Sequence, residues 1–176
     1  MKGQKKMQLK YFLLTLVLCA CANVPDLEKA EKLHKQGVAE QEKGNLTEAL
    51  KLYEQSCRSG YKEVCWAVGR IYSEEPQYVD LKKAHYFFDK SCNLGFVGGC
   101  IYAAQNESRL CGYNNNLTEL KEKELEECFD KKAVPNSLKY LQKACDLGEC
   151  SGINAYNEYT EKSQRVNQLL KEQNKK

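Results

Sequence analysis

The feature that most constrains the fold of this chain is a repeated pair of cysteines. The segment Ala49 to Cys65 matches Ala84 to Cys100 at a constant offset of 35 residues, with the Ala, the Ser-Cys pair, the Gly and the second Cys in register. A third copy, Ser137 to Cys150, has four residues between its cysteines, where the first two copies have seven. A period near 35 residues is typical of stacked pairs of helices. The sequence therefore predicts an all-α protein built from repeats.

Well-placed glycines mark the helix boundaries within the repeat. Only three prolines and eleven glycines occur in 176 residues, which favours helices over sheet. We predict that one helix ends before Gly44 and that Asn45 to Glu48 forms a capping box for the next. Gly60 and Gly95 supply the left-handed residue that ends the second helix of each pair.

Ten cysteines are the unusual part of the composition. Because no Cys-x-x-Cys motif is present, a disulfide framework in an oxidising compartment is the better interpretation than a metal site or a redox motif. Eight of the cysteines belong to the body of the chain, and the predicted pairs are Cys57 with Cys65, Cys92 with Cys100, Cys111 with Cys128 and Cys145 with Cys150. Only the first two pairs are constrained by the repeat spacing. A pairing of Cys111 or Cys128 with Cys150 stays open.

The first 22 residues have the pattern of an export signal. Four lysines precede or flank a short apolar run, Tyr11 to Leu18, which is too brief to span a bilayer. Leu18 to Cys21 resembles a bacterial lipobox, which would make Cys21 the lipidated first residue of the mature protein. Ala20 to Ala22 alternatively fits an ordinary signal-peptidase site. Residues 23–26 would form a short tether, and contact with a membrane would come only through the lipid.

Removal of this leader also changes the charge of the protein. Without its four lysines the formal net charge falls from +3 to −1. The apparent basicity therefore belongs to the leader, and we do not expect a nucleic-acid partner. The predicted location is the periplasm or outer membrane, or the outside of the cell.

The cysteine spacing carries a resemblance to a known family. The two Cys-x7-Cys pairs, the Ser-Cys-x-x-Gly turns and Val79 to Ala84 after Tyr72 resemble the Sel-one-like repeat (SLR), a longer relative of the tetratricopeptide repeat (TPR), and specifically the Helicobacter cysteine-rich protein family. The resemblance covers roughly Glu31 to Ala155 and implies a secreted bacterial α/α solenoid of TPR/SLR-type helix pairs stapled by disulfides, here over residues 27–174. It also implies penicillin binding and β-lactamase activity. The chain departs from the family pattern in an insertion at about residues 107–134 and in Cys150, which comes three residues early.

The sequence offers little support for catalysis or for a cofactor. A serine β-lactamase needs a Ser-x-x-Lys element, which Ser59 to Lys62 matches, together with Ser-Asp-Asn and Lys-Thr-Gly elements, which are absent. About one such match is expected by chance in a chain this rich in lysine, so we assign no catalytic residue. His34 and His85 are the only histidines and have no partners at metal-ligand spacing, so we expect neither a metal nor a cofactor.

The function that remains is recognition by a surface. Stacked helix pairs form a curved array whose inner face is built mainly from the first helix of each pair. We expect ligand-binding residues at exposed positions of those helices, and the candidates are Lys62, Trp66, Arg70 and Arg109. The predicted partner is a protein, a peptide or a peptidoglycan-like cell-wall fragment. A weak β-lactam-binding protein or β-lactamase is the alternative that the family resemblance implies.

Overall fold

The computed structural model describes residues 26–113, 127–155 and 157. Within these residues every regular element is a helix, namely α2 (Leu27–Glu42), α3 (Leu46–Arg58), α4 (Lys62–Glu74), α5 (Leu81–Asn93), α6 (Val97–Tyr113), the π-helical turn η2 (Phe129–Ala133) and α8 (Val134–Asp146). Residues 151–155 are helical as well. The predicted leader with Cys21, the middle of the predicted insertion and the residues after 157 lie outside the described part of the chain.

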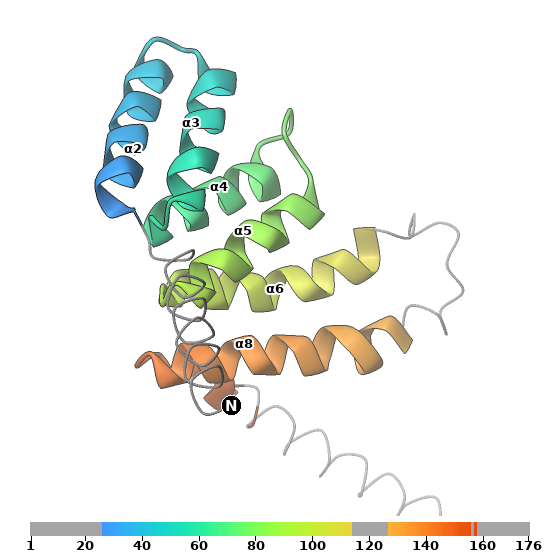
Figure 1. Cartoon of the computed structure of the whole chain (residues 1–176). Coiled ribbons are helices and arrows are strands. Elements are labelled where there is room, and N and C mark those ends of the chain that lie inside the picture. Colours follow the sequence, from blue (N-terminus) through green and yellow to red (C-terminus); the bar gives the residue numbers. More distant parts are fainter. Residues whose placement is uncertain (1–25, 114–126, 156, 158–176) are drawn as a thin grey trace, which may run out of the picture.

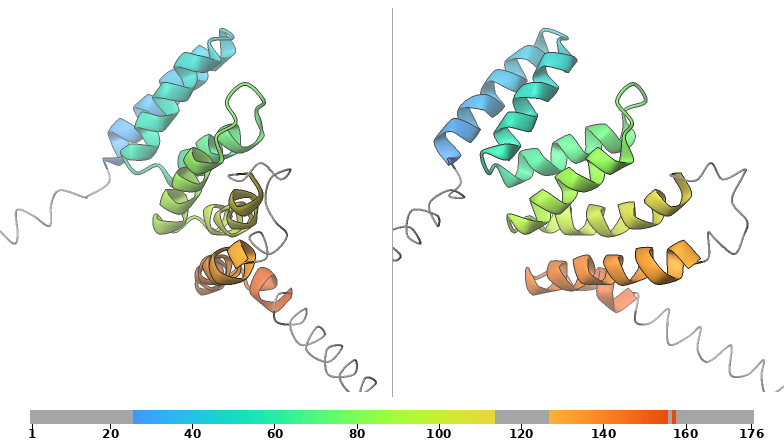
Figure 2. Two further views of the ribbon diagram at one scale, coloured as in Figure 1. Left: turned by 90° about the vertical axis from the view of Figure 1, so that its right-hand side faces the viewer. Right: turned by 45° about the vertical axis from the view of Figure 1, so that its right-hand side comes forward.

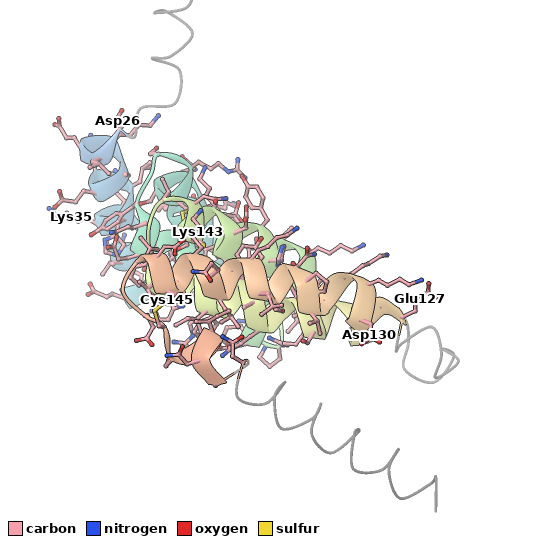
Figure 3. The ribbon with its side chains drawn as sticks, turned by 90° about the horizontal axis from the view of Figure 1, so that it is seen from below. Asp26, Lys35, Glu127, Asp130, Lys143 and Cys145 are labelled. Atoms are coloured by element: carbon pink, nitrogen blue, oxygen red, sulfur yellow. A yellow bond between two sulfur atoms is a disulfide. The ribbon has the colours of Figure 1, made fainter. Side chains whose placement is uncertain are left out.

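Successive helices run antiparallel and pack against one another in chain order (Figures 1 and 2). The pair α2 and α3 is inclined to the helices that follow, which stack below it in Figure 1. Seen from below, α8 closes the stack, with Cys145 near one end and Glu127 and Asp130 at the other (Figure 3). The main core lies between α3, α4, α5 and α6, and Phe88 is among its largest fully buried side chains.

The helix boundaries follow the glycines and capping residues of the sequence. Gly60 and Gly95 have φ values of 108° and 83°, as predicted, and Gly148 ends α8 in the same way at 103°. The Asp80 carboxylate caps α5 by accepting hydrogen bonds from the backbone amides of Lys82 (3.1 Å) and Lys83 (3.0 Å).

The predicted capping box at the start of α3 does not form. Asn45 occupies the N-cap position, but its side chain makes no capping hydrogen bond. Its amide nitrogen instead donates to Glu40 Oε2 of the preceding helix at 2.9 Å. The carboxylate of Glu40 competes for the Asn45 side chain because the tight turn at Gly44 brings α2 close to the start of α3.

Four disulfides join the end of one helical segment to the start of the next. They are Cys57–Cys65, Cys92–Cys100, Cys111–Cys128 and Cys145–Cys150. These are the four pairs that the sequence favours, and neither Cys111 nor Cys128 bonds to Cys150. The first two bridges have all four cysteines fully buried, so they are part of the packed interior as well as covalent links.

The disulfides also bear on where the protein works. Four bridges in one small chain indicate an oxidising location outside the cytoplasm, since reducing thiols would keep the cysteines free in the cytosol. In the described residues, none of the helices has both the length and the hydropathy required of a membrane span.

The serine of each Ser-Cys pair has a structural role. Ser56 Oγ on α3 donates to the carbonyl oxygen of Ala30 on α2 at 2.6 Å, and Ser91 Oγ on α5 donates to that of Lys62 on α4 at 2.7 Å. Both serines are fully buried. Each therefore ties the second helix of a pair to the first. The third copy has Ala144 at this position, and Ser137 at the start of α8 donates to the Ala104 carbonyl oxygen of α6 at 2.8 Å instead.

Replacing Ser91 with alanine should lower the free energy of unfolding by about 1 kcal/mol, because one buried hydrogen bond is lost while the Lys62 carbonyl keeps its place in α4. Ser56→Ala should have a similar effect on the first pair. Urea unfolding followed by circular dichroism measures both. Ser108→Ala, at an exposed position of α6, serves as the control. Equal stability of Ser91→Ala and Ser108→Ala would show that the hydroxyl does not hold the helices together.

The described part of the predicted insertion consists of helix extensions. α6 continues past Asn106 to Tyr113, and η2 leads directly into α8. The Cys111–Cys128 disulfide joins these two extensions. Residues 114–126, the middle of the predicted insertion, lie outside the described residues.

Candidate functional site

A groove of about 320 Å³ lies between α2 and α4, the first helices of the first two pairs. Its walls come from both helices, and Tyr53 of α3 contributes to its lining. The remaining lining residues are His34, Gln41, Val64, Trp66, Ala67, Arg70, Ile71, Glu74 and Glu75. The groove therefore combines aromatic, aliphatic and charged side chains on the face where the repeat pattern predicts recognition.

The α4 wall is a consequence of helical spacing. Trp66, Arg70 and Glu74 are four residues apart, so they share one side of the helix, whereas Val68 and Tyr72 point into the core. The Arg70 guanidinium lies over the Trp66 ring, 5.3 Å from its centroid. Arg70 Nη2 also donates to Glu74 Oε2 at 2.5 Å and Arg70 Nε at 3.1 Å. This bond lowers the pKa of the Glu74 carboxyl, so both members of the pair are charged near neutral pH.

Trp66 connects the groove to the next pair of helices. Its ring contacts Phe96 and, edge-on, Tyr102 of α6, with centroid distances of 5.8 and 5.7 Å. Its indole nitrogen is buried and has no hydrogen-bond partner among the described residues. A buried donor without an acceptor is uncommon in folded proteins. The ring is thus fixed by packing, while its polar atom stays unsatisfied.

The opposite wall and the floor are held by aromatic contacts and one polar bond. The His34 ring contacts Tyr53 and, edge-on, Tyr61, with centroid distances of 5.9 and 5.2 Å. Tyr53 Oη donates to Gln41 Oε1 at 2.8 Å. Burial, with a smaller contribution from the charge of Glu42, raises the pKa of Tyr53, so this hydroxyl stays a hydrogen-bond donor.

The structure brings together only two of the four predicted binding residues. Trp66 and Arg70 line the groove, whereas Lys62 lines a separate cavity of about 470 Å³ with Leu27, Tyr61 and Leu94 among its walls. Arg109 donates from Nη1 to the Ser73 hydroxyl and from Nη2 to the Ser73 carbonyl oxygen at 3.0 Å, so it fastens α6 to the end of α4.

Ten of the described residues line the groove, and eight of them, all except Trp66 and Arg70, were not among the predicted binding residues. His34 and Gln41 look like ordinary surface positions of the first helix, and Tyr53 belongs to the buried stripe of α3. The spacing of Tyr53 indicates burial correctly, but it does not show that one edge of the ring reaches a groove. Only the crossing of α2 and α4 over α3 determines that exposure.

The Ser59-x-x-Lys62 element does not have the geometry of a catalytic pair. Ser59 is the residue that ends α3, and Gly60 in the left-handed conformation follows it. No hydrogen bond joins the Ser59 and Lys62 side chains among the contacts of the described residues, and a nucleophile needs its base within such reach. The described residues also contain no group of three or more His, Cys, Asp or Glu side chains that could hold a metal ion.

A second polar cluster joins α5, α6 and α8. Tyr140 Oη of α8 donates to Asp89 Oδ1 of α5 at 2.8 Å, and His85 Nε2 lies 3.3 Å from Glu107 Oε1 of α6. Asn136 Nδ2 donates to the other Glu107 oxygen at 3.2 Å. Burial is the main cause that raises the pKa of Tyr140, and the hydrogen bond to Asp89 adds to it. The cluster links the third pair of helices to the second.

The tyrosines give the fold a predictable dependence on alkaline pH. Burial and the bond to Glu54 raise the pKa of Tyr72 as burial and Asp89 raise that of Tyr140. An unfolded tyrosine has a pKa of about 10, so the folded protein binds protons that the unfolded chain releases above that pH. The stabilising contribution is therefore complete below about pH 10 and is lost as the pH rises further.

Urea unfolding at a series of pH values between about 9 and 11 should show this fall in the free energy of unfolding. Tyrosinate absorbance should show two tyrosines, Tyr72 and Tyr140, that ionise only on unfolding. Tyr140→Phe should weaken the decline, whereas Tyr86→Phe, at an exposed position of α5, should leave it unchanged. A flat stability between about pH 9 and 11 would contradict the assignment.

A scan against models of protein families finds no match for this chain, and a search of curated proteins finds none either. The resemblance to the Sel-one-like repeat therefore rests on the sequence features given above: the cysteine spacing, the Ser-Cys-x-x-Gly turns and Val79 to Ala84 after Tyr72. What the protein does is inferred from its repeat, its disulfides and the groove between α2 and α4.

Proposed function

We propose that this protein is an exported solenoid of TPR/SLR-type helix pairs that binds a protein, a peptide or a cell-wall fragment on the face formed by α2 and α4. The 35-residue period, the antiparallel order of the helices and the disulfides at the junctions between pairs support this architecture. Its location is the periplasm, the outer membrane or the outside of the cell, with Cys21 as the lipidated residue if the lipobox is used.

The groove lined by Trp66 and Arg70 is the observation that carries the binding function. Tryptophan, tyrosine and arginine contribute most to binding energy in protein interfaces, and all three line this groove. Its volume of about 320 Å³ is at the lower end of the range for ligand pockets. A single pocket of this size suits one or two side chains of a larger ligand, which is how a repeat surface binds an extended partner.

Catalysis has weaker support than binding. The β-lactamase alternative requires an activated serine, and the turn that contains Ser59 provides no base in hydrogen-bonding contact with it among the described residues. No feature of the groove supplies another serine or cysteine nucleophile, since none lines it. We therefore place the function in recognition.

Trp66 is the only tryptophan in the chain, so its fluorescence reports on the groove without labelling. We expect pools of short peptides, or soluble peptidoglycan fragments, to shift the Trp66 emission in a saturable way. Arg70→Ala should weaken the binding of a responding ligand by about tenfold, as loss of an interface arginine typically does.

Arg58→Ala is the matched control for this test, because Arg58 forms a similar ion pair with Glu54 on α3 but does not line the groove. It should leave the affinity unchanged. A ligand that binds the Arg70→Ala variant as tightly as the unchanged protein would show that binding takes place elsewhere.

A further inference from the structure

The residues that line the groove differ in charge and polarity from one end to the other. Glu74 and Glu75 line the end where α4 finishes, and Gln41 lines it where α2 finishes. Glu42, the last residue of α2, directly follows Gln41 in the chain, and its charge adds to the burial that raises the pKa of Tyr53. Two carboxylates, those of Glu74 and Glu75, therefore line one end of a groove whose middle is aromatic, and Glu42 follows the lining residue Gln41 at the same end.

The basic groups near this end leave two of the carboxylates without a partner. Arg70 is bonded to Glu74, Arg109 is held by Ser73, and Lys43 at the end of α2 is paired with Glu40 at 2.6 Å. The side chains of Glu42 and Glu75 form no ion pair or hydrogen bond with any described residue. Their negative charge is available to a ligand.

The backbone adds to the same polarity. The C-terminal ends of α2 and α4 both lie at this end of the groove, at Glu42 and Glu74. A helix C-terminus carries partial negative charge from its free carbonyl groups and favours a nearby cation. The two helix C-termini and the two unpaired carboxylates therefore all favour a positively charged group at this end of the groove.

The middle of the groove indicates which other kind of side chain the ligand carries. Tyr53, Trp66 and Ile71 present apolar surface there. An apolar side chain fits this part, and a basic side chain one or two residues away reaches the carboxylates. We propose that the groove binds a peptide segment of a partner protein in which a lysine or arginine adjoins an apolar residue.

This proposal rests on the proposed binding function and adds the class of ligand to it. It is tested with three pools of blocked hexapeptides, apolar at the other positions and carrying a fixed central lysine, glutamine or glutamate. Trp66 emission measures binding to the full mature protein. We expect the lysine pool to bind about tenfold more tightly than the glutamate pool, and the difference to shrink as salt screens the carboxylates.

The carboxylates are tested with the double variant Glu42→Gln and Glu75→Gln. Each exposed charge is expected to contribute up to about fivefold in affinity, so the variant should lose most of the preference for lysine. Glu63→Gln removes an exposed carboxylate from the other end of α4, outside the groove, and should keep the preference. Circular dichroism checks that the variants remain folded.

The outcomes separate the ligand class from the function itself. Equal binding of the three pools, or tighter binding of the glutamate pool, overturns the ligand class but leaves peptide binding in place. A response to soluble peptidoglycan fragments with none to any peptide pool also overturns it, while the binding function stands. No change of Trp66 emission with peptides or fragments overturns both.

Discussion

Replacing Phe88 with alanine is expected to lower the free energy of unfolding by about 3 to 5 kcal/mol, because a large buried ring is lost and a cavity is left behind. Phe88 is 1% exposed and lies at the centre of the stack. Its ring meets Tyr102 of α6 at a centroid distance of 5.2 Å and packs against Gly69 of α4 on another side. Three helices therefore depend on one side chain.

The cavity left by Phe88→Ala cannot close easily, because the disulfides on either side limit how far α4, α5 and α6 can move together. Gly69 already allows the closest approach, since a Cβ there would lie 2.6 Å from the Phe88 ring. The control is Tyr86→Ala on the same helix, 51% exposed, for which about 0.5 kcal/mol is expected. Chemical denaturation measures both, and similar losses for the two variants would contradict this packing.

Replacing Cys92 and Cys100 together with serine is the second change with a large expected effect. The chain-entropy model gives about 2.5 kcal/mol for a closed loop of this length, and two serine hydroxyls in fully buried positions add a further cost. A loss of this size corresponds to a fall of about 5 to 10 °C in Tm. The bridge links α5 to α6, so their shared core should become accessible to protease.

Cys111→Ser with Cys128→Ser provides the informative comparison. Its loop is longer, with a separation of 17 residues instead of 8, so loop entropy alone predicts the larger loss there. We expect the opposite order, because Cys128 is only partly buried whereas Cys92 and Cys100 are fully buried.

Thiol titration of the native protein should find none of the eight body cysteines free. Two or more reactive thiols in the folded protein would contradict a purely structural role for the bridges.

The parts of the fold that the sequence predicts correctly are those set by local chemistry. Gly60 and Gly95 adopt positive φ because the chain must leave a helix in a short turn, and glycine does so without steric cost. The Cys57–Cys65 and Cys92–Cys100 bridges follow from the same turns, which place each pair of cysteines on facing helix ends.

The features that the sequence does not predict depend on contacts between distant residues. Asn45 occupies the predicted N-cap position, but its side chain donates a hydrogen bond to Glu40 of the previous helix instead of capping α3. Arginine is a common residue in binding sites, yet the guanidinium of Arg109 donates its hydrogen bonds to Ser73, 36 residues earlier in the chain. The groove itself depends on the angle between α2 and α4, which no local pattern encodes. The position of Trp66 and Arg70 on one side of α4 follows from their spacing of four residues, which the sequence alone shows.

The short sequence separation of each disulfide has a consequence for biogenesis. The bridged cysteines are 8, 8, 17 and 5 residues apart, and the four loops follow one another along the chain without overlapping. A polypeptide that enters an oxidising compartment with its N-terminus first can close each loop before the next pair of cysteines arrives. Oxidation in the order of arrival would then give the native pairs without any reshuffling of bridges between repeats.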